Sequence, residues 1–379
     1  MDYSALKHKA NRILDNLRGW QTDRKILVIE SDDWGSIRMP SKETYQRCIH
    51  AGYPVDKTVY ERYDSLLSQD DLELLFNLLS TFQDKNGNQP VITANCVVAN
   101  PDFEKMKNDS YTDYHYELIT ETFQKYPKHK NNFDLWKEGI SNKIFFPQYH
   151  AREHLNVIKF MNALRERDPD VLFGVENHMP GCIPRGSESK GNEYIEATRF
   201  GTPEDRDKIL SIYLEGLDLF ETLFGYNSET VTPPNYTWSN AFNKPVLDKG
   251  VKYYQGIREF IEPLFDGGGR IRAHYLGKMN DIGQIHLLRN AFFEPSSMSK
   301  LKIKDPVGQC LSDISIAFRM KKPAVICSHR INYCGFIEQN NRDRTLRMLQ
   351  EILRTALNTW PEIEFMNSLQ LGKEIKAEG

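Results

Sequence analysis

Short apolar runs alternate along the chain with longer amphipathic stretches. The clearest run lies in residues 25–35, where Ile26 to Ile29 form an uninterrupted apolar segment of the kind found in strands buried on both faces. This run ends abruptly in Asp32 and Asp33, which are ordinary turn residues when taken alone. Similar runs predict strands at residues 90–100, 143–150, 171–175, 252–255, 284–295, 324–329 and 363–366, and a short strand that ends within residues 231–240.

Apolar residues at helical spacing predict helices between these strands. In residues 70–87, leucines recur on one face behind two aspartates, and the segment closes with a glycine. The start of a helix at residues 203–224 is marked by Thr202, which suits an N-cap, and by Pro203 in the first turn. Further helices are predicted at residues 4–19, 41–51, 151–169, 240–249, 306–319 and 341–359.

The alternation of strands with helices is typical of α/β proteins. Seven or eight strands predict an irregular, TIM-like (β/α) barrel, with a doubly wound open sheet as the alternative. No Pro/Ser/Gly-rich linker divides the chain, so we expect one domain over residues 1–379. Breaks in the alternation predict loop insertions near residues 103–140, 181–200 and 260–283, and the first of these is long, aromatic and aperiodic.

Composition narrows the class of protein. The chain has 379 residues, of which 40% are hydrophobic and 27% charged, as is typical of a soluble globular protein. Its 49 Lys and Arg residues balance 52 Asp and Glu residues to a net charge of -3, without a long block of either sign, which argues against a nucleic-acid partner. No run approaches the roughly 18 apolar residues of a membrane span, so no membrane partner is expected.

The N-terminal residues 1–20 lack the apolar core of a signal peptide. The cysteines are scattered without a CxxC pair, and several lie inside apolar runs, which is typical of buried reduced thiols. Both features favour a cytoplasmic location. The sequence indicates no oligomeric state. The cysteines are Cys48, Cys96, Cys182, Cys310, Cys327 and Cys334.

Two histidines follow the strand predicted at residues 143–150. His150 and His154, in the motif HAREH, are four residues apart at the expected start of a helix, where side chains at i and i+4 share one face and can bind one metal ion. A solvated helix end and a core histidine are the alternatives. The motif differs from the HExxH zinc-protease arrangement, because its glutamate, Glu153, stands beside the second histidine.

A carboxylate from another strand end would complete a hydrolytic metal centre. Two histidines and one carboxylate leave open positions for water and substrate. Such a ligand set suits Zn²⁺ best and also accepts Co, Ni, Mn or Fe. The reaction needs a base, for which an aspartate next to the ligand aspartate is well placed. It also needs an acid, for which His329, at the end of the predicted strand 324–329, is a candidate.

Taken together, these motifs resemble those of the polysaccharide deacetylase family, a carbohydrate esterase-like branch of the glycoside hydrolase/deacetylase superfamily. ESDDWG resembles the family's first motif, HAREH its His-x-x-x-His motif, and VICSHRINY its late strand that ends in histidine. The three matches follow the family's order along the chain. The resemblance implies that Asp33, His150 and His154 hold a divalent metal, that Asp32 is the base and that His329 is the acid.

Two further motifs of the family are not matched. Where the third motif has Arg followed by Pro and an aromatic residue, this chain has Thr232 in VTPPNYTW, although Pro234 and Tyr236 keep part of the pattern. The fourth motif has no counterpart in KYYQGIRE. Arg258 and Arg289 are the candidates to supply the missing cation from another strand. The resemblance thus extends to the metal site and leaves the substrate open.

The activity that the resemblance implies is deacetylation of an N- or O-acetylated carbohydrate. Trp34, Tyr236 and Trp238 are candidates to stack on a sugar, with burial in the core as the alternative, and Pro234 and Arg289 would line the same groove. A metal-dependent amidase or glycosidase on the same barrel is a second hypothesis, although glycosidases use two carboxylates flanking the bond. A carbohydrate-binding relative without catalysis, which the missing arginine favours, is a third.

Overall fold

The computed structural model describes residues 3–180, 185, 193–298 and 303–378. Its main sheet is built around β1 (Lys25–Trp34), which pairs in parallel with β2 (Ile92–Val97) on one side and β12 (Ala324–His329) on the other. The parallel order continues beyond β2 with β5 (Phe145–Ala151), β6 (Thr230–Val231), β7 (Tyr253–Gly256) and β10 (Ile285–Leu288), and beyond β12 with β11 (Ala291–Phe292).

The sheet curls until its two ends meet. β10 and β11, at opposite ends of the strand order, belong to one continuous stretch, residues 285–292, whose first half pairs with β7 and second half with β12. At the junction, the backbone N–H of Arg289 donates to Gly256 and that of Asn290 donates to Val325. The predicted (β/α) barrel is therefore confirmed, with eight strands in its order, and the open sheet is excluded.

Apolar side chains fill the amino-terminal part of the barrel. A further strand, β13 (Ile363–Met366), pairs with the first residues of β1, and the helix that follows, α15 (Ser368–Glu378), packs against β1, β7 and β10. Ile26 and Val28 of β1 share a buried cluster with Leu371 and Ile375 of α15. This filling leaves the carboxyl ends of the strands as the place for polar site residues.

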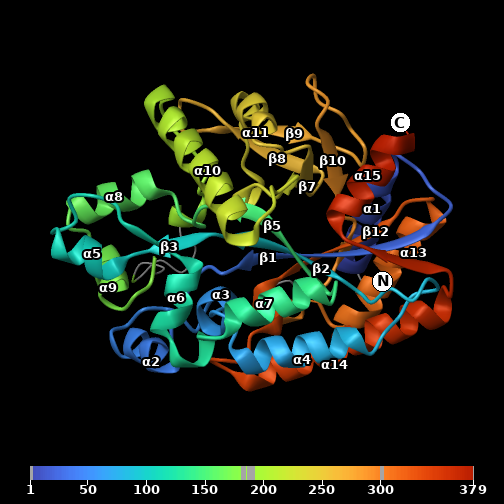
Figure 1. Cartoon of the computed structure of the whole chain (residues 1–379), viewed down its shortest axis with the longest axis horizontal. Coiled ribbons are helices and arrows are strands. Elements are labelled where there is room, and N and C mark those ends of the chain that lie inside the picture. Colours follow the sequence, from blue (N-terminus) through green and yellow to red (C-terminus); the bar gives the residue numbers. More distant parts are fainter. Residues whose placement is uncertain (1–2, 181–184, 186–192, 299–302, 379) are drawn as a thin grey trace.

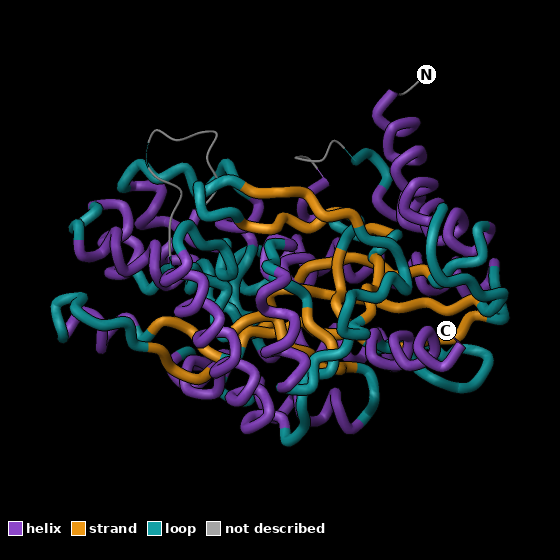
Figure 2. The backbone as a smooth tube through the Cα atoms, turned by 90° about the horizontal axis from the view of Figure 1, so that it is seen from above, coloured by secondary structure: helices purple, strands orange, loops and turns teal. Residues whose placement is uncertain are grey.

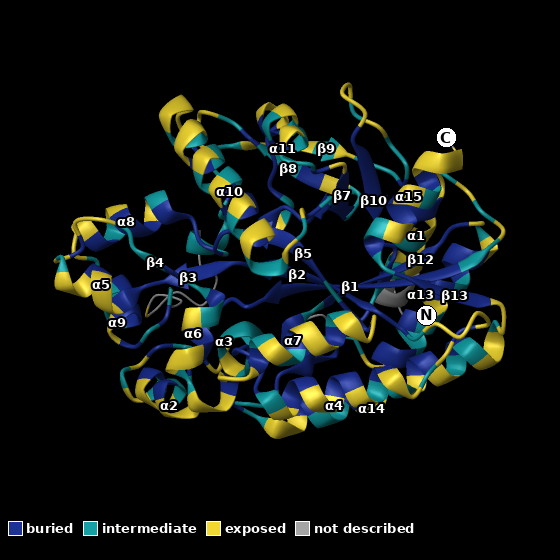
Figure 3. Cartoon of the chain, in the orientation of Figure 1, coloured by how far each residue is buried: buried dark blue, intermediate teal, exposed yellow. Residues whose placement is uncertain are grey.

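Helices cover the outside of the sheet (Figures 1 and 2). The longer ones bury one side and expose the other, so buried residues (dark blue) and exposed residues (yellow) alternate along them in Figure 3. Leu27 and Ile29 of β1 belong to the large core beneath these helices, which confirms that β1 is buried on both faces. The covering helices are α4 (Gln69–Ser80), α7 (Asn132–Ser141), α10 (Pro203–Phe224), α13 (Pro306–Arg319) and α14 (Gln339–Thr359).

The remaining elements lie around this barrel. The predicted insertion at residues 260–283 contains a two-stranded hairpin, β8 (Glu259–Pro263) and β9 (Gly269–Ala273). The other elements are α1 (Tyr3–Asn16), α2 (Lys42–His50), α3 (Val59–Tyr63), β3 (Ala99–Pro101), α5 (Phe103–Asn108), β4 (Tyr116–Leu118), α6 (Ile119–Lys125), α8 (Val157–Arg165), α9 (Pro169–Glu176) and α11 (Asn243–Asp248).

Two predictions of local structure outside the histidine motif are wrong. Residues 171–175 lie in helix α9 and not in a strand, because Asp168 caps the helix by accepting hydrogen bonds from the next turn and Pro169 occupies its first position. The segment at residues 103–140 is not an irregular loop, since it contains α5, α6 and α7 and the short strand β4. Its helices are short, which hides their periodicity among the aromatic residues.

The described cysteines are all buried, as predicted: Cys48, Cys96, Cys310, Cys327 and Cys334. Cys182 lies outside the described residues, as does most of the insertion predicted at residues 181–200. In the part of the chain that the structure describes, no helix combines the length and the apolar character needed to cross a bilayer.

Candidate metal centre

The two acids of β1 stand at a β-bulge. In the pairing of β1 with β2, the single residue Asn95 lies opposite both Asp32 and Asp33. Asp33 takes a positive φ of 73°, a conformation that Asp adopts more readily than most residues. Bulges of this kind re-aim side chains. Here both carboxylates line the same cavity, although successive residues of a regular strand point to opposite faces.

The two histidines come from a strand end and the bend after it. His150 lies in β5, and His154 precedes α8, which begins at Val157 because Asn156 caps it. The prediction that both histidines share a helix face is therefore wrong. The chain bends after Ala151 instead, and this bend brings the two imidazole rings to 4.9 Å between their centroids.

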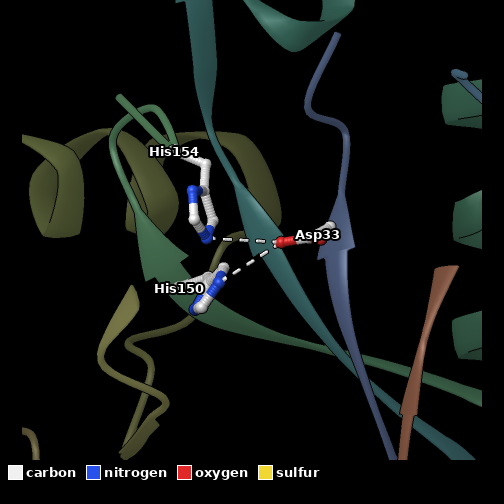
Figure 4. Close-up of side chains that lie close together, drawn as sticks. All are labelled: Asp33, His150 and His154. Atoms are coloured by element: carbon white, nitrogen blue, oxygen red, sulfur yellow. Dashed lines mark ion pairs between the residues drawn. The ribbon is translucent and has the colours of Figure 1, made fainter. Parts of the chain in front are cut away.

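Asp33, His150 and His154 point toward one another (Figure 4). Oδ1 of Asp33 lies 3.6 Å from Nε2 of His150 and 3.4 Å from Nε2 of His154. These separations are long for hydrogen bonds. They match the roughly 3.4 Å between two ligand atoms that each lie about 2.0–2.1 Å from one tetrahedral Zn²⁺. Within the described ranges, this is the one group of three metal-ligating side chains that converges so closely.

The protonation states of the group also fit a cation. Nδ1 of His150 lies 2.6 Å from the carbonyl oxygen of Thr232, which can only accept, so Nδ1 carries the proton and Nε2 is left as a ligand atom. Burial lowers the pKa of His154 to about 3, which keeps that ring neutral. Burial acts to raise the pKa of Asp33, but the charge of Arg38 outweighs it and lowers that pKa well below its usual value.

Arg38 holds the second oxygen of Asp33. Its Nη2 lies 3.2 Å from Oδ2 of Asp33, and its Nε lies 3.0 Å from Oδ2 of Asp64. Asp64 is fully buried and pairs in turn with Arg330 at 2.8 Å. This chain of charges orients Asp33 so that Oδ1 faces the histidines. Sequence reasoning missed all three supporting residues, because they are far apart in the sequence. Arg38 and Asp64 belong to none of the motifs, and Arg330 follows His329 in VICSHRINY without any local sign of its role.

Asp32 is held by Arg289 in a doubly hydrogen-bonded ion pair. Nη1 and Nη2 of Arg289 donate to Oδ2 and Oδ1 of Asp32 at 2.6 and 2.7 Å, and Asn95 adds a hydrogen bond to Oδ1 at 2.7 Å. The third nitrogen, Nε, donates to Glu30 at 2.5 Å. Burial acts to raise the pKa of Asp32, but Arg289 outweighs it and lowers that pKa to about 2.

Arg289 also contacts the segment in which an arginine was expected. Its Nη2 donates to Oγ1 of Thr232 at 3.1 Å, and its Nη1 donates to the hydroxyl of Tyr236 at 3.0 Å. The other candidate, Arg258, lies 3.3 Å from Asp15 instead. Of the two arginines considered from the sequence, Arg289 is thus the one that reaches Asp32.

His329 forms a close pair with Glu294, which sequence reasoning did not single out. Nδ1 of His329 lies 2.5 Å from Oε1 of Glu294, and Nε2 lies 3.9 Å from Oδ2 of Asp32. Asn332 donates to the other oxygen of Glu294 at 2.8 Å. Burial acts to lower the pKa of His329, but Glu294, and then Asp32 and Asp33, outweigh it and raise that pKa well above its usual value.

If His329 is the acid of a hydrolysis reaction, as the resemblance implies, this pairing predicts the effect of Glu294→Gln on the pH dependence of that reaction. A raised pKa keeps His329 protonated to higher pH. Activity that needs the imidazolium therefore falls only when the pH rises above that pKa. Removing the charge of Glu294 lowers the pKa of His329, and we expect the alkaline limb of the kcat profile to move down by about one pH unit or more. Glu338→Gln serves as the control, because Glu338 is an exposed acid that pairs with Arg62. This substitution should leave the alkaline limb in place. An unmoved limb in Glu294→Gln contradicts the assignment.

Comparisons with known proteins find similarity in structure alone. No protein-family profile matches the chain, and no curated protein sequence matches it. A peptidoglycan deacetylase and an allantoinase superpose on this chain. The Bacillus subtilis peptidoglycan deacetylase PdaC is 10% identical, with 94% of this chain and 93% of that chain covered and a TM-score of 0.36. Puue allantoinase is 9% identical, with 94% and 92% covered and a TM-score of 0.49.

A larger enzyme also superposes. For the 4-alpha-glucanotransferase of Thermococcus litoralis, the identity is 11% and the TM-score 0.46, and 94% of this chain is covered. This chain spans 40% of the length of that enzyme. At such identities and TM-scores, none of these similarities assigns a reaction to this chain.

The residues predicted to bind substrate divide between the cavity and the core. A cavity of about 250 Å³ is lined by both acids, both histidines and His329, and also by Tyr236 and Pro233. Pro234 is buried beside it. Trp34 cannot stack on a sugar, because its ring is fully buried against Phe145 and its Nε1 donates to Ser31.

Trp238 is likewise a core residue rather than a platform at this cavity. It is 5% exposed and packs edge-on against Tyr213 and Phe242. Its indole Nε1 donates to Asn243 at 2.8 Å. Of the aromatic residues proposed from the sequence, Tyr236 alone lines the cavity at the metal centre.

Proposed function

We propose that this protein is a metal-dependent hydrolase that removes an acetyl group from an N- or O-acetylated carbohydrate. The observation that carries the proposal is the convergence of Asp33, His150 and His154 beside a second acid, Asp32, and a protonated histidine, His329, around one cavity. This arrangement would supply a cation site, a base and an acid around one cavity, which are the parts that acyl transfer to water requires.

The three ligand side chains would hold a divalent ion, with zinc as the first expectation. When bound, such an ion acts as a Lewis acid toward the acyl carbonyl and makes water a stronger nucleophile. The chain prepares this site in advance: Arg38 fixes Asp33, and the carbonyl of Thr232 fixes His150 with Nε2 free. The second carboxylate, Asp32, is left available for proton transfer.

Asp32 and His329 are suited to opposite proton transfers. Asp32 takes a proton from the attacking water as the water oxygen bonds to the acyl carbon. His329 gives a proton to the departing nitrogen or oxygen as the bond to the acyl carbon breaks. The products are acetate and a free amine or alcohol. Oδ2 of Asp32 and Nε2 of His329 are 3.9 Å apart, which supports the proposal that both groups act on one bond.

The pKa shifts put both groups in the required state at neutral pH. Asp32, with its pKa lowered to about 2, is ionised, and His329, with its pKa raised well above its usual value, is protonated. The resulting window of activity is broad, since it extends from above the pKa of Asp32 to the pKa of His329. The low basicity of Asp32 limits its strength as a base, so Asp32 would depend on the acidified water that a divalent ion held by Asp33, His150 and His154 would supply.

Two other functions are less well supported. A glycosidase needs two carboxylates that flank the scissile bond, whereas Asp33 faces the two histidines and leaves Asp32 as the one carboxylate of the pair outside the ligand group. A binding protein without catalysis was favoured by Thr232 in place of arginine. Arg289 now supplies a guanidinium at the side chain of Thr232, which removes the reason for preferring that hypothesis.

The test is acetate release from N- and O-acetylated sugars by protein that has been stripped with a chelator and reloaded with one metal at a time. We expect no release from the stripped protein and recovery with Zn²⁺, Co²⁺, Ni²⁺ or Mn²⁺. The same substrates given to His154→Ala should yield no acetate with any metal. Full activity in the stripped protein, or no acetate from any acetylated sugar with any metal, would contradict the proposed function.

A further inference from the structure

A second, larger cavity adjoins the metal centre. It has a volume of about 440 Å³, and Tyr60, Tyr236 and His329 line both it and the smaller cavity. The two spaces therefore meet at the side chain that would protonate the leaving group. In a hydrolase of this kind, the acyl group lies at the metal, and the rest of the substrate extends past the acid. The larger cavity lies where that rest of the substrate would go.

Two arginines from distant elements line this second cavity. Arg12 comes from α1, and Arg258 from the link between β7 and β8. Both contact one buried carboxylate, Asp15, at 3.1 and 3.3 Å. Asp15 is their shared counter-charge, and burial is the largest cause of its raised pKa. Glu259 adds a more distant one at 3.6 Å from Arg258, but its side chain is half exposed.

Arg12 is held in position with unused hydrogen-bonding capacity. Its guanidinium lies 4.2 Å from the centroid of the Phe292 ring, and its side chain is 12% exposed. Its Nε and Nη1 have no aligned hydrogen-bond acceptor among the described residues, even though Nη1 is in ion-pair contact with Asp15. A guanidinium that is held in place next to a second one, with two nitrogens that lack an aligned acceptor, is suited to a carboxylate, whose geometry matches its donors.

We propose that the second cavity binds a carboxylate carried by the leaving-group part of the substrate, and that Arg12 and Arg258 determine this specificity. The substrate class is then an acetylated sugar with an acidic substituent, such as an N-acetylated uronic acid, in preference to the neutral sugar. Phe292 and Tyr236 also line this cavity and would contact the body of the sugar. The proposal rests on the hydrolase function proposed above and extends it.

The experiment compares N-acetylglucosamine with the same sugar oxidised to a carboxylate at C6, and includes the 6-phosphate as a second anion. For the zinc-loaded full chain, we expect a higher kcat/KM for the carboxylate than for either other sugar. Arg12→Gln should lower kcat/KM for the carboxylate by about 10- to 100-fold, as for loss of a charge-assisted hydrogen bond, and change the value for the neutral sugar by less than about threefold.

Arg206→Gln is the matched control, because Arg206 lies on α10, pairs with Asp207 and lines neither cavity. It should leave all three kcat/KM values unchanged. If Arg12→Gln does not fold, as judged by circular dichroism, Arg258→Gln replaces it with the same expected loss. Calorimetric binding of the three sugars to the metal-free protein gives a readout that does not depend on turnover, and the carboxylate should bind most tightly.

The two proposals fail in different ways. Equal kcat/KM and equal binding for the neutral and carboxylate sugars, unchanged by Arg12→Gln, overturn the carboxylate site and leave the hydrolase standing. Preference for the phosphate overturns the choice of a carboxylate. Carboxylate-dependent binding that Arg12→Gln abolishes, without turnover of any sugar at any metal, supports the site and contradicts the hydrolase.

Discussion

Asp32→Asn should lower kcat for acetate release by about 10²- to 10⁴-fold while leaving one metal ion bound, because the substitution removes the base and keeps its shape. Asp32 contributes no atom to the group formed by Asp33, His150 and His154. The measurement is steady-state kinetics on zinc-loaded protein together with elemental analysis of the same sample. Metal content that stays at the wild-type level separates the role of Asp32 from that of Asp33.

The control for this substitution is Asp71→Asn. Asp71 is also a fully buried aspartate paired with an arginine, Arg342 at 2.8 Å, but it lies at the start of α4 and lines neither cavity. The Asp71→Asn variant measures the effect of neutralising a buried, paired acid away from the site. The kcat of this variant should stay near that of the wild type. If Asp32→Asn keeps more than about a tenth of the activity, Asp32 is not the base.

Arg289→Met should reduce the free energy of unfolding by about 3–5 kcal/mol at neutral pH. The guanidinium of Arg289 is fully buried between Glu30 and Asp32, and removing it leaves two buried carboxylates without their counter-charge. The measurement is urea unfolding at a series of pH values. Because Arg289 is what lowers the pKa of Asp32 to about 2, the stability that this pair contributes is present above roughly pH 4 and is lost as pH falls toward 2.

The difference between wild type and Arg289→Met should therefore be largest at neutral pH and shrink on acidification. Arg24→Met is the matched control. Arg24 makes the same kind of doubly hydrogen-bonded pair, with Glu364, but its side chain is 36% exposed. We expect Arg24→Met to cost less than about 1 kcal/mol, as is usual for surface pairs. Equal losses in the two variants would show that burial of the Arg289 pair does not matter.

The sequence was informative where chemistry and backbone depend on neighbouring residues. The apolar run before Asp32 and Asp33 predicted β1, because a strand that is buried on both faces needs apolar residues at consecutive positions. The strand at residues 324–329 and the helix at residues 203–224 are predicted with the bounds that β12 and α10 have. The assignment of Asp33, His150 and His154 to one site came from the resemblance, and the structure brings these three side chains together.

The sequence was uninformative where tertiary structure decides. The spacing of His150 and His154 is compatible with a helix. The helix begins only after Asn156, however, and a bend in the chain brings the two rings close together instead. The residues around Glu294 in the sequence do not indicate its role, because that role depends on a hydrogen bond with His329, which is 35 residues away. Arg289 is similar: nothing in its own segment shows that closure of the barrel brings it to Asp32.

The most direct test of the metal centre is anomalous diffraction from crystals of the zinc-loaded protein, recorded on both sides of the zinc absorption edge. We expect one strong peak within about 2.0–2.2 Å of Oδ1 of Asp33 and of Nε2 of both His150 and His154, and no such peak in crystals of Asp33→Ala. A zinc-loaded crystal with no peak between these three side chains, or the same peak in Asp33→Ala, would contradict the account.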